Sequence, residues 1–214
     1  MNLSSEQRQW FESMRSHWNE HIVPISTLPA QRVFDVGSAI PQSALSKAQV
    51  FADRVSAMRV LPANGKIAEL GTQAGWFAEQ VMTVLRPREL HLFDLEVDTL
   101  RRARPALAEH TSVRLHIGDS SIELAKLPDH YFDWIYIDGD HRLEGVRRDA
   151  KVAVEKIKPD GILVFNDYTV WSVLEFTDYG VVPVVNDLLA SGEWTMVYIA
   201  LHPLMYCDVA LRRA

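Results

Sequence analysis

Short apolar runs alternate with amphipathic stretches from Lys66 almost to the end of the chain. Apolar runs bounded by turn residues predict strands, and apolar residues three and four positions apart predict helices. The predicted strands cover 66–71, 89–94, 112–117, 132–138 and 161–166, and the predicted helices cover 75–86, 97–108, 120–126, 142–157 and 181–190. This alternation predicts a Rossmann-like, doubly wound α/β fold, with helices on both faces of a mostly parallel sheet.

The first 60 residues follow a different pattern. Apolar side chains from Trp10 to Trp18 recur at helical spacing, and Ser4 with Gln7 has the form of a capping box, which predicts a helix from Ser4 to about Ile22. Prolines and a glycine make 23–43 an irregular connection, and a second helix is predicted over 43–60. We therefore predict an N-terminal helical cap over residues 1–60 and a second domain over residues 61–214.

The last part of the chain holds two β-rich runs, "EWTMVYIAL" and "MYCDVALR". Both are rich in the β-branched and aromatic residues that favour strands, and a short polar segment separates them. They are predicted to pair as a terminal hairpin.

Composition narrows the class of protein. The 214 residues are 48% hydrophobic and 23% charged, which is typical of a globular protein, and the net charge of −6 argues against a nucleic-acid partner. The single cysteine, Cys207, excludes an internal disulfide and a multi-cysteine metal site. The chain begins with a polar segment and has no apolar run long enough for a membrane span, so we expect no membrane partner and, by default, a cytoplasmic protein.

A glycine-rich turn follows the first predicted strand, in "KIAELGTQAGWFAEQV". Glu69, Gly71 and Gly75 lie where that strand becomes a helix, at the sheet edge where open α/β sheets bind ligands. The spacing of the glycines matches neither the dinucleotide-binding pattern nor a P-loop. This weakens the case for a nicotinamide cofactor and for a nucleoside triphosphate.

Acidic residues end the next two predicted strands. Asp94 is placed to accept hydrogen bonds from the ribose hydroxyls of an adenosine ligand, and Glu96 replaces it if the strand ends two residues later. Asp119, followed by Ser120, either accepts a hydrogen bond from an adenine amino group or caps the next helix.

In this order, the three motifs resemble those of the class I S-adenosylmethionine-dependent methyltransferases, over residues 60 to 212. The resemblance implies a seven-stranded sheet with an antiparallel last strand and S-adenosylmethionine as cofactor. It further implies that Glu69, Gly71 and Gly75 bind the methionine part, Asp94 the ribose, and Asp119 with Ser120 the adenine.

Polar groups also end the fourth and fifth predicted strands. Asp138, Asp140 and His141 follow "DWIYI", and Asn166 and Asp167 follow "GILVF". Since two adjacent strands deliver oxygen ligands to one edge, Asp138, Asn166 and Asp167 are predicted to hold a divalent cation such as Mg²⁺.

The segment "IYIDGDHRLEGVRRDAKVAVEKIKPDGILVFNDY" resembles a finer branch, the small-molecule O-methyltransferases that include sugar and catechol O-methyltransferases. That resemblance implies metal-binding acids at Asp138 and Asp167, with Asp138 close to the reacting methyl group and His141 as general base. The chain departs from the branch at Asn166, where some relatives carry a carboxylate, and at Pro159-Asp160-Gly161, which replaces Pro-Gly-Gly.

Together these features predict an enzyme that methylates a hydroxyl of a small molecule, a sugar or another secondary metabolite, with divalent-metal assistance. Two alternatives stay open: a metal-independent N- or carboxyl-methyltransferase, and a non-catalytic module that binds S-adenosylmethionine.

An aromatic loop follows the fifth predicted strand and contains Tyr168, Trp171, Phe176 and Tyr179. It is predicted either to cover an apolar acceptor or to anchor to the core or to a second subunit. The same alternatives apply to Trp10 and Trp18 of the first predicted helix. If these aromatic side chains contact a second subunit, the protein is a homodimer.

Overall fold

The computed structural model describes residues 3–26 and 34–214, which divide into two compact units, Met1–Asp35 and Val36–Ala214. The first unit holds helix α1 (Ser5–His21) and the short helix α2 (Val23–Ser26). The predicted capping box is present, with the Ser4 hydroxyl accepting from Gln7 N–H and the Gln7 side chain accepting from Ser4 N–H. No residue of α1 is buried. The predictions that this helix forms a cap or contacts a second subunit therefore stay predictions.

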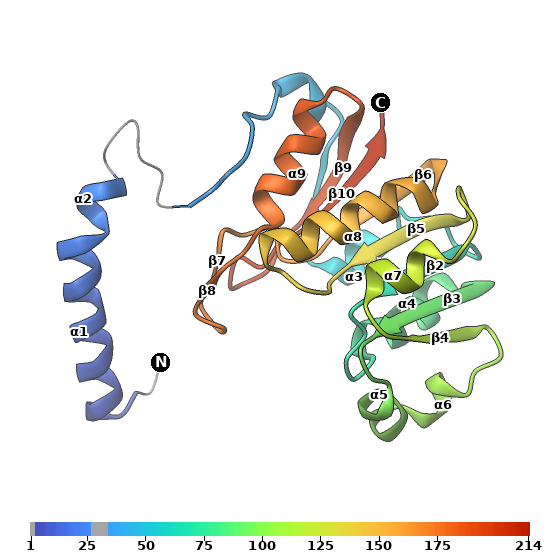
Figure 1. Cartoon of the computed structure of the whole chain (residues 1–214), viewed down its shortest axis with the longest axis horizontal. Helices are drawn as coiled ribbons and strands as arrows, with labels where there is room; N and C mark the ends of the chain where they lie inside the picture. Colours follow the sequence, from blue (N-terminus) through green and yellow to red (C-terminus); the bar gives the residue numbers. More distant parts are fainter. Residues whose placement is uncertain (1–2, 27–33) are drawn as a thin grey trace. The chain divides into compact units, whose positions relative to one another are not determined.

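The second unit is a three-layer α/β fold built on an eight-stranded sheet (Figure 1). Its strands are β1 (Gln49–Phe51), β2 (Lys66–Leu70), β3 (Glu89–Asp94), β4 (Val113–Ile117), β5 (Phe132–Ile137), β6 (Ile157–Phe165), β9 (Trp194–Ala200) and β10 (Asp208–Arg213). Their order is β1-β9-β10-β6-β5-β2-β3-β4, and only β10 runs antiparallel to its neighbours. The predicted Rossmann-like sheet, the terminal hairpin and the antiparallel last strand are confirmed, with one strand more than the seven expected.

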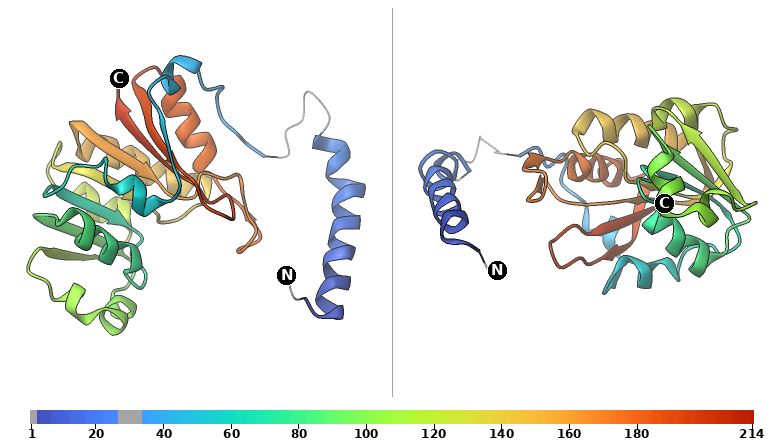
Figure 2. Two further views of the ribbon diagram at one scale, coloured as in Figure 1. Left: turned by 180° about the vertical axis from the view of Figure 1, so that it is seen from behind. Right: turned by 90° about the horizontal axis from the view of Figure 1, so that it is seen from below.

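Helices cover both faces of this sheet (Figure 2). The helices are α3 (Arg54–Met58), α4 (Trp76–Leu85), α5 (Asp98–Ala103), α6 (Pro105–Ala108), α7 (Ser120–Ala125), α8 (Leu143–Lys156) and α9 (Val181–Ala190). One apolar cluster joins α7, α8 and α9 to the sheet, and a second cluster joins α3, α4, α5 and α6 to the other face. Alternate residues of β5 enter each cluster, with Ile135 in the first and Trp134 in the second, so the central strand is buried on both sides.

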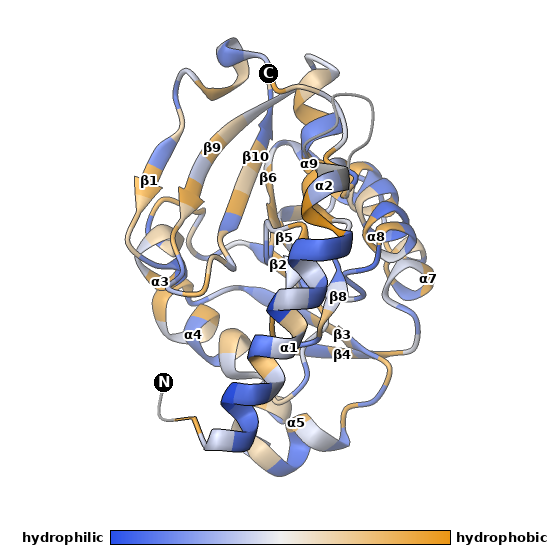
Figure 3. Ribbon diagram, turned by 90° about the vertical axis from the view of Figure 1, so that its left-hand side faces the viewer, coloured by the Kyte–Doolittle hydropathy of each residue, from blue (hydrophilic) through white to orange (hydrophobic). Residues whose placement is uncertain are grey.

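The eighth strand comes from a segment that was predicted as a helix. Residues 43–60 contain a 3-10 helix (Gln42–Leu45), β1 and α3, so the prediction of one helix there is wrong. Val50 and Phe51 suit a strand, and β1 pairs in parallel with β9 (Figure 3). Asp53 then accepts a hydrogen bond of 2.7 Å from Ser56 N–H, which starts α3 as a separate helix. Residues 36–60 thus pack in the same compact unit as the sheet.

The predicted helix 97–108 is interrupted by a proline. Pro105 has no N–H to donate and occupies the first turn of α6, while Arg104 leaves the helical conformation with φ −141°. Two short helices, α5 and α6, therefore replace the single one. A smaller hairpin, β7 (Trp171–Ser172) with β8 (Thr177–Asp178), forms within the aromatic loop. No helix in the described ranges 3–26 and 34–214 is long and apolar enough to cross a membrane.

A buried imidazole, His91, and a half-buried one, His116, make the stability of this fold sensitive to acid. The His116 ring stacks on Phe93, and its Nε2 lies 3.0 Å from Nδ1 of His91. Burial, followed by the nearby charge of His91, lowers the pKa of His116 from 6.5 to about 4. As pH falls below about 6.5, the unfolded chain therefore takes up a proton that the folded chain does not accept until about pH 4.

We expect His116 to lower the free energy of unfolding by about 2 kcal/mol between about pH 7 and about pH 4.5. Urea denaturation at both pH values measures this loss. His116→Gln should reduce it, whereas His110→Ala, at an exposed position, should not. An identical pH dependence in the wild type and His116→Gln would contradict the assignment.

Candidate active site

Two adjoining cavities lie at the carboxyl ends of the parallel strands. The first has a volume of about 400 Å³ and the second about 480 Å³. Gly71, Gln73, Asp138 and Gly139 line both, so the cavities meet where the glycine turn approaches the end of β5. A ligand that reaches from one cavity into the other would pass over this junction.

The glycine turn has a backbone that only glycine adopts easily. Gly71 has φ +87°, and Gly75, which precedes α4, has φ +74°. A Cβ atom on Gly71 would collide with the carbonyl oxygen of Asp138. Glycine at position 71 therefore lets the turn lie directly against the end of β5.

Glu69 is a buried acid at the end of β2 that lines the first cavity. It is 2% exposed, and among the described side chains its Oε2 is one of the few buried oxygen atoms without a hydrogen-bond partner. Burial, then the charges of Asp138 and Asp94, raises its pKa well above the ordinary value. A donor or cationic group of a ligand would satisfy this carboxylate.

Asp94, at the end of β3, holds the glycine turn and lines the second cavity. Its Oδ2 accepts from Thr72 N–H at 3.0 Å and from Gln73 N–H at 2.6 Å. Glu96, the sequence alternative, instead accepts from Asp98 and Thr99 N–H at the start of α5. The geometry therefore favours Asp94 over Glu96 for contact with a ligand in the second cavity.

Asp119 caps α7, as one of the two sequence interpretations held. Its Oδ1 accepts from Ser121 and Ile122 N–H at 3.0 and 3.2 Å. Ser120 Oγ donates to Asp149 at 2.6 Å, and Asp119, Ser120 and Asp149 all line the second cavity. Asp149 is 3% exposed, and burial raises its pKa to about 6. Sequence reasoning missed it, although an acid on the apolar face of helix 142–157 was a visible signal.

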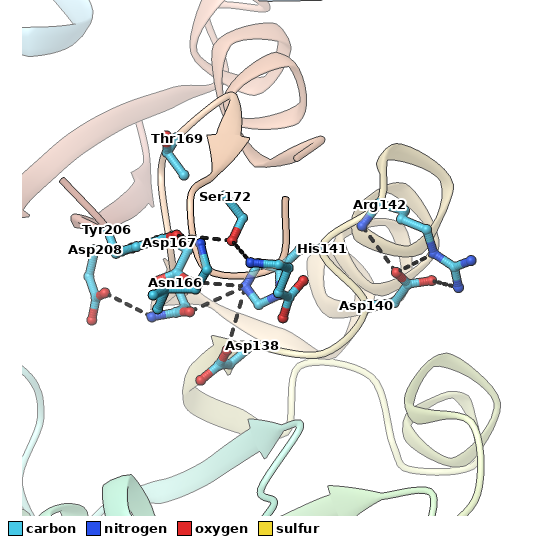
Figure 4. A network of polar contacts seen from close by, with 12 residues as sticks. Asp138, Asp140, His141, Arg142, Asn166, Asp167, Thr169, Ser172, Tyr206 and Asp208 are labelled. Carbon is cyan, nitrogen blue, oxygen red and sulfur yellow. Dashed lines mark hydrogen bonds and ion pairs between the residues drawn. The ribbon is translucent and has the colours of Figure 1, made fainter. Parts of the chain in front are cut away.

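The polar groups after β5 separate into the two cavities. Asp138 and His141 line the first cavity, together with Asn166 and Asp167 at the end of β6. Asp140 lines the second and is held by Arg142, whose Nη2 donates at 2.8 Å (Figure 4). Asp140 thus takes no part in the cluster around His141.

Three oxygen atoms surround one nitrogen of His141 (Figure 4). Nε2 lies 3.2 Å from Asn166 Oδ1, 3.5 Å from Asp138 Oδ1 and 3.9 Å from Asp167 Oδ2. The ring stacks on Tyr179, with centroids 4.6 Å apart and planes inclined by 17°. Stacking on Tyr179 therefore sets the plane of the His141 ring, and the contact with Asn166 sets the position of Nε2.

A buried polar network lies behind Asn166. Its Nδ2 donates to Asp208 Oδ1 at 3.1 Å and to the Tyr136 hydroxyl at 3.0 Å, while Tyr136 donates to Asp208 Oδ2 at 2.9 Å. Arg54 Nη2 lies 3.1 Å from Asp208 and 3.8 Å from Asp167. Arg54, Tyr136 and Asp208 were not predicted as site residues, although an acid inside the apolar run "MYCDVALR" was a signal for Asp208.

The carboxylates of this cluster are costly to ionise. Burial raises the pKa of Asp138 well above its ordinary value, and the charges of Asp167 and Asp208 raise it further. Burial also raises the pKa of Asp208 to about 6, against the opposing effect of Arg54. A cationic ligand beside Asp138 would favour its ionised form.

The residues predicted to bind a divalent cation do not fit one as they are arranged. Oxygen atoms of Asp138, Asn166 and Asp167 converge on His141 Nε2, so the imidazole occupies the position between them. Arg54 already supplies a positive charge beside Asp167. Within residues 3–26 and 34–214, no three His, Cys, Asp or Glu side chains form a group that could hold a metal.

The aromatic loop anchors to the core through some of its rings and exposes others. Tyr179 is buried against His141, and the Tyr168 hydroxyl donates to Asn186 at 2.6 Å. Phe176 is 56% exposed and packs edge-on against Trp171, with centroids 5.2 Å apart. Leu174 and Glu175 of the same loop line the first cavity, which places the loop beside the site.

Comparisons with known proteins agree with this architecture. Residues 68–168 match a family model described as a methyltransferase domain. No curated protein sequence matches the chain at a significant level.

Solved structures extend the likeness in fold. An S-adenosylmethionine-dependent methyltransferase from Mesorhizobium loti matches with a TM-score of 0.55 at 20% identity, over 74% of this chain and 95% of that one. The pyocyanin biosynthetic protein PhzM matches with a TM-score of 0.56 at 18% identity, over 75% of this chain and 54% of that one. MycE from mycinamycin biosynthesis, in complex with Mg and SAH, matches with a TM-score of 0.52 at 14% identity, over 71% of this chain and 45% of that one. The chain thus has the fold of class I S-adenosylmethionine-dependent methyltransferases.

Proposed function

We propose that this protein is a methyltransferase that uses S-adenosylmethionine to methylate a hydroxyl group of a small molecule. The observation that carries the cofactor assignment is Glu69, a buried acid that lines the first cavity beside the glycine turn and whose Oε2 has no hydrogen-bond partner within the described part of the chain. Its carboxylate suits the ammonium group of the methionine part. The second cavity, with Asp94 and Asp119, suits the adenosine part.

Several residues would hold the cofactor in this arrangement. The glycine turn, with Gly71 and Gly75, lets the backbone lie against the methionine part, and Asp94 is placed to accept from ribose hydroxyls. Asp119 and Ser120 line the wall of the cavity where the adenine would lie. When bound, S-adenosylmethionine supplies a methyl group on a positively charged sulfur, which departs as a neutral thioether.

His141 supports a hydroxyl as the acceptor. A hydroxyl is a weak nucleophile until its proton is removed, whereas a carboxylate needs no base. His141 lines the same cavity as Glu69 and Asp138, so it is placed to take the proton of an acceptor in that cavity. Carboxylates near the imidazole would stabilise the imidazolium that forms.

Since the side chains around His141 do not fit a divalent cation, the proposal routes no step through a metal. We expect methyl transfer from radiolabelled S-adenosylmethionine to a member of a panel of small hydroxyl compounds. The rate should be the same in EDTA as in Mg²⁺. A rate that EDTA abolishes and Mg²⁺ restores would contradict the metal-free form of the proposal, and transfer to amines or carboxylates alone would contradict the hydroxyl acceptor.

A further inference from the structure

The cluster around His141 places an amide of defined surroundings against one of the two ring nitrogens. We propose that Asn166, oriented by Asp208, holds His141 as the tautomer with its hydrogen on Nε2, so that Nδ1 is the nitrogen that accepts a proton from the acceptor. The proposal rests on the proposed function for its catalytic meaning. Its structural part stands on the contacts alone.

The orientation of the Asn166 amide follows from its buried partners. Asp208 accepts hydrogen bonds when ionised, and Arg54 lies 3.1 Å from it, which favours that form. The Tyr136 hydroxyl gives its hydrogen to Asp208, so its oxygen is left to accept. Both neighbours therefore require the NH₂ side of Asn166, which lies 3.1 Å from Asp208 and 3.0 Å from Tyr136.

With its NH₂ group committed, Asn166 presents its carbonyl oxygen to His141. An amide oxygen only accepts, so Nε2, at 3.2 Å, must donate. The other two atoms near Nε2 are carboxylate oxygens of Asp138 and Asp167, which also accept when ionised. The Asn166 oxygen, which can only accept, therefore favours a hydrogen on Nε2, and neutral imidazole then keeps its lone pair on Nδ1.

In this arrangement the network prepares Nδ1 of His141 to accept the proton of the acceptor hydroxyl. In the transfer, the hydroxyl proton passes to His141 Nδ1, the oxygen forms a bond to the methyl carbon, and the carbon–sulfur bond breaks with its electron pair left on sulfur. The products are a methyl ether, S-adenosylhomocysteine and an imidazolium, which later releases its proton to water. Asn166 and Asp208 are positioning residues, because they act through the His141 ring.

The direct test is the tautomer of His141, measured by nitrogen-15 NMR on the full chain and assigned by the loss of signals in His141→Gln. We expect Nε2 to show the shift of a protonated nitrogen and Nδ1 that of an unprotonated one, at a pH where the ring is neutral. The opposite tautomer in the wild type would overturn the proposal. This readout needs no turnover, and it is made on the wild-type protein, with the variant used for assignment alone.

Two substitutions at one position separate positioning from simple stability. Asp208→Leu removes the acceptor for Asn166 NH₂, so a fraction of His141 should change to the Nδ1–H tautomer and kcat should fall at least about tenfold. Asp208→Asn keeps an oxygen towards Asn166 and should retain both the tautomer and most of kcat. The KM for S-adenosylmethionine should be similar in all three proteins. Retention of the Nε2–H tautomer in a folded Asp208→Leu protein would contradict the role of Asp208.

Mn²⁺ tests whether a divalent cation, instead of the imidazole N–H, binds the oxygen atoms of Asp138, Asn166 and Asp167. Its unpaired electrons broaden the NMR signals of nearby nuclei. We expect the His141 signals to stay sharp, because the imidazole N–H already occupies the oxygen cluster. Broadening of His141 that Mg²⁺ competes away would overturn the proposal.

The two levels of proposal fail separately. The Nε2–H tautomer without methyl transfer to any hydroxyl would remove the proposed function and leave the assignment of the network. Methyl transfer to a hydroxyl by a protein with the Nδ1–H tautomer would support the proposed function and overturn the assignment of the network.

Discussion

Replacement of His141 by alanine should lower kcat for methyl transfer by about 10²–10⁴-fold, the range typical of a lost general base. His141 lines the cavity that also contains Glu69 and Asp138, and it is held by Asn166 and by the Tyr179 ring. Affinity for S-adenosylmethionine should change little, because the cofactor is assigned to Glu69, the glycine turn and Asp94. The rate is measured with saturating cofactor, and the affinity by calorimetry.

The matched control is His110→Ala, an exposed histidine at a position that lines neither cavity. It should keep the wild-type rate. Thermal unfolding of both variants checks that each is folded. A folded His141→Ala protein with the wild-type kcat would remove the base assignment, and with it the main support for a hydroxyl acceptor.

Asp94→Ala should weaken binding of S-adenosylmethionine by about 1–3 kcal/mol, or about 5- to 150-fold in Kd. Two losses add in this variant. The ribose would lose charged hydrogen bonds, and Thr72 and Gln73 N–H would lose the carboxylate that fixes the turn. Calorimetric titration of the cofactor measures the change in Kd.

Asp98→Ala is the comparison for Asp94→Ala. Asp98 is an acid of the neighbouring helix α5, and its side chain is 74% exposed and lines neither cavity. It should bind the cofactor as the wild type does. Equal Kd values for Asp94→Ala and the wild type would refute the ribose assignment.

Local patterns were sufficient to predict most of the sheet. The strands that end at Leu70, Asp94 and Ile137 are short apolar runs, and buried parallel strands have that composition whatever else the chain does. Since parallel strands end at one edge, the sequence also placed Glu69, Asp138 and Asn166 near a common site, and all three line the first cavity.

Features that depend on contacts between distant segments were not predictable in the same way. Val50 and Phe51 fit a helical spacing as well as a strand, and only pairing with β9 decides between them. The side of Asn166 that faces His141 depends on Asp208, which arrives from another strand of the sheet. The predicted metal ligands were correctly placed together, but the imidazole that they surround could be located only in three dimensions.

Calorimetric titration of S-adenosylmethionine into the purified protein, in EDTA and in Mg²⁺, shows whether this chain binds the cofactor at all. We expect one saturable binding event with the same affinity in both solutions, and weaker binding to Asp94→Ala. If the cofactor binds in neither solution, the protein is not a methyltransferase of this kind, and the Gly71 turn is a structural feature alone.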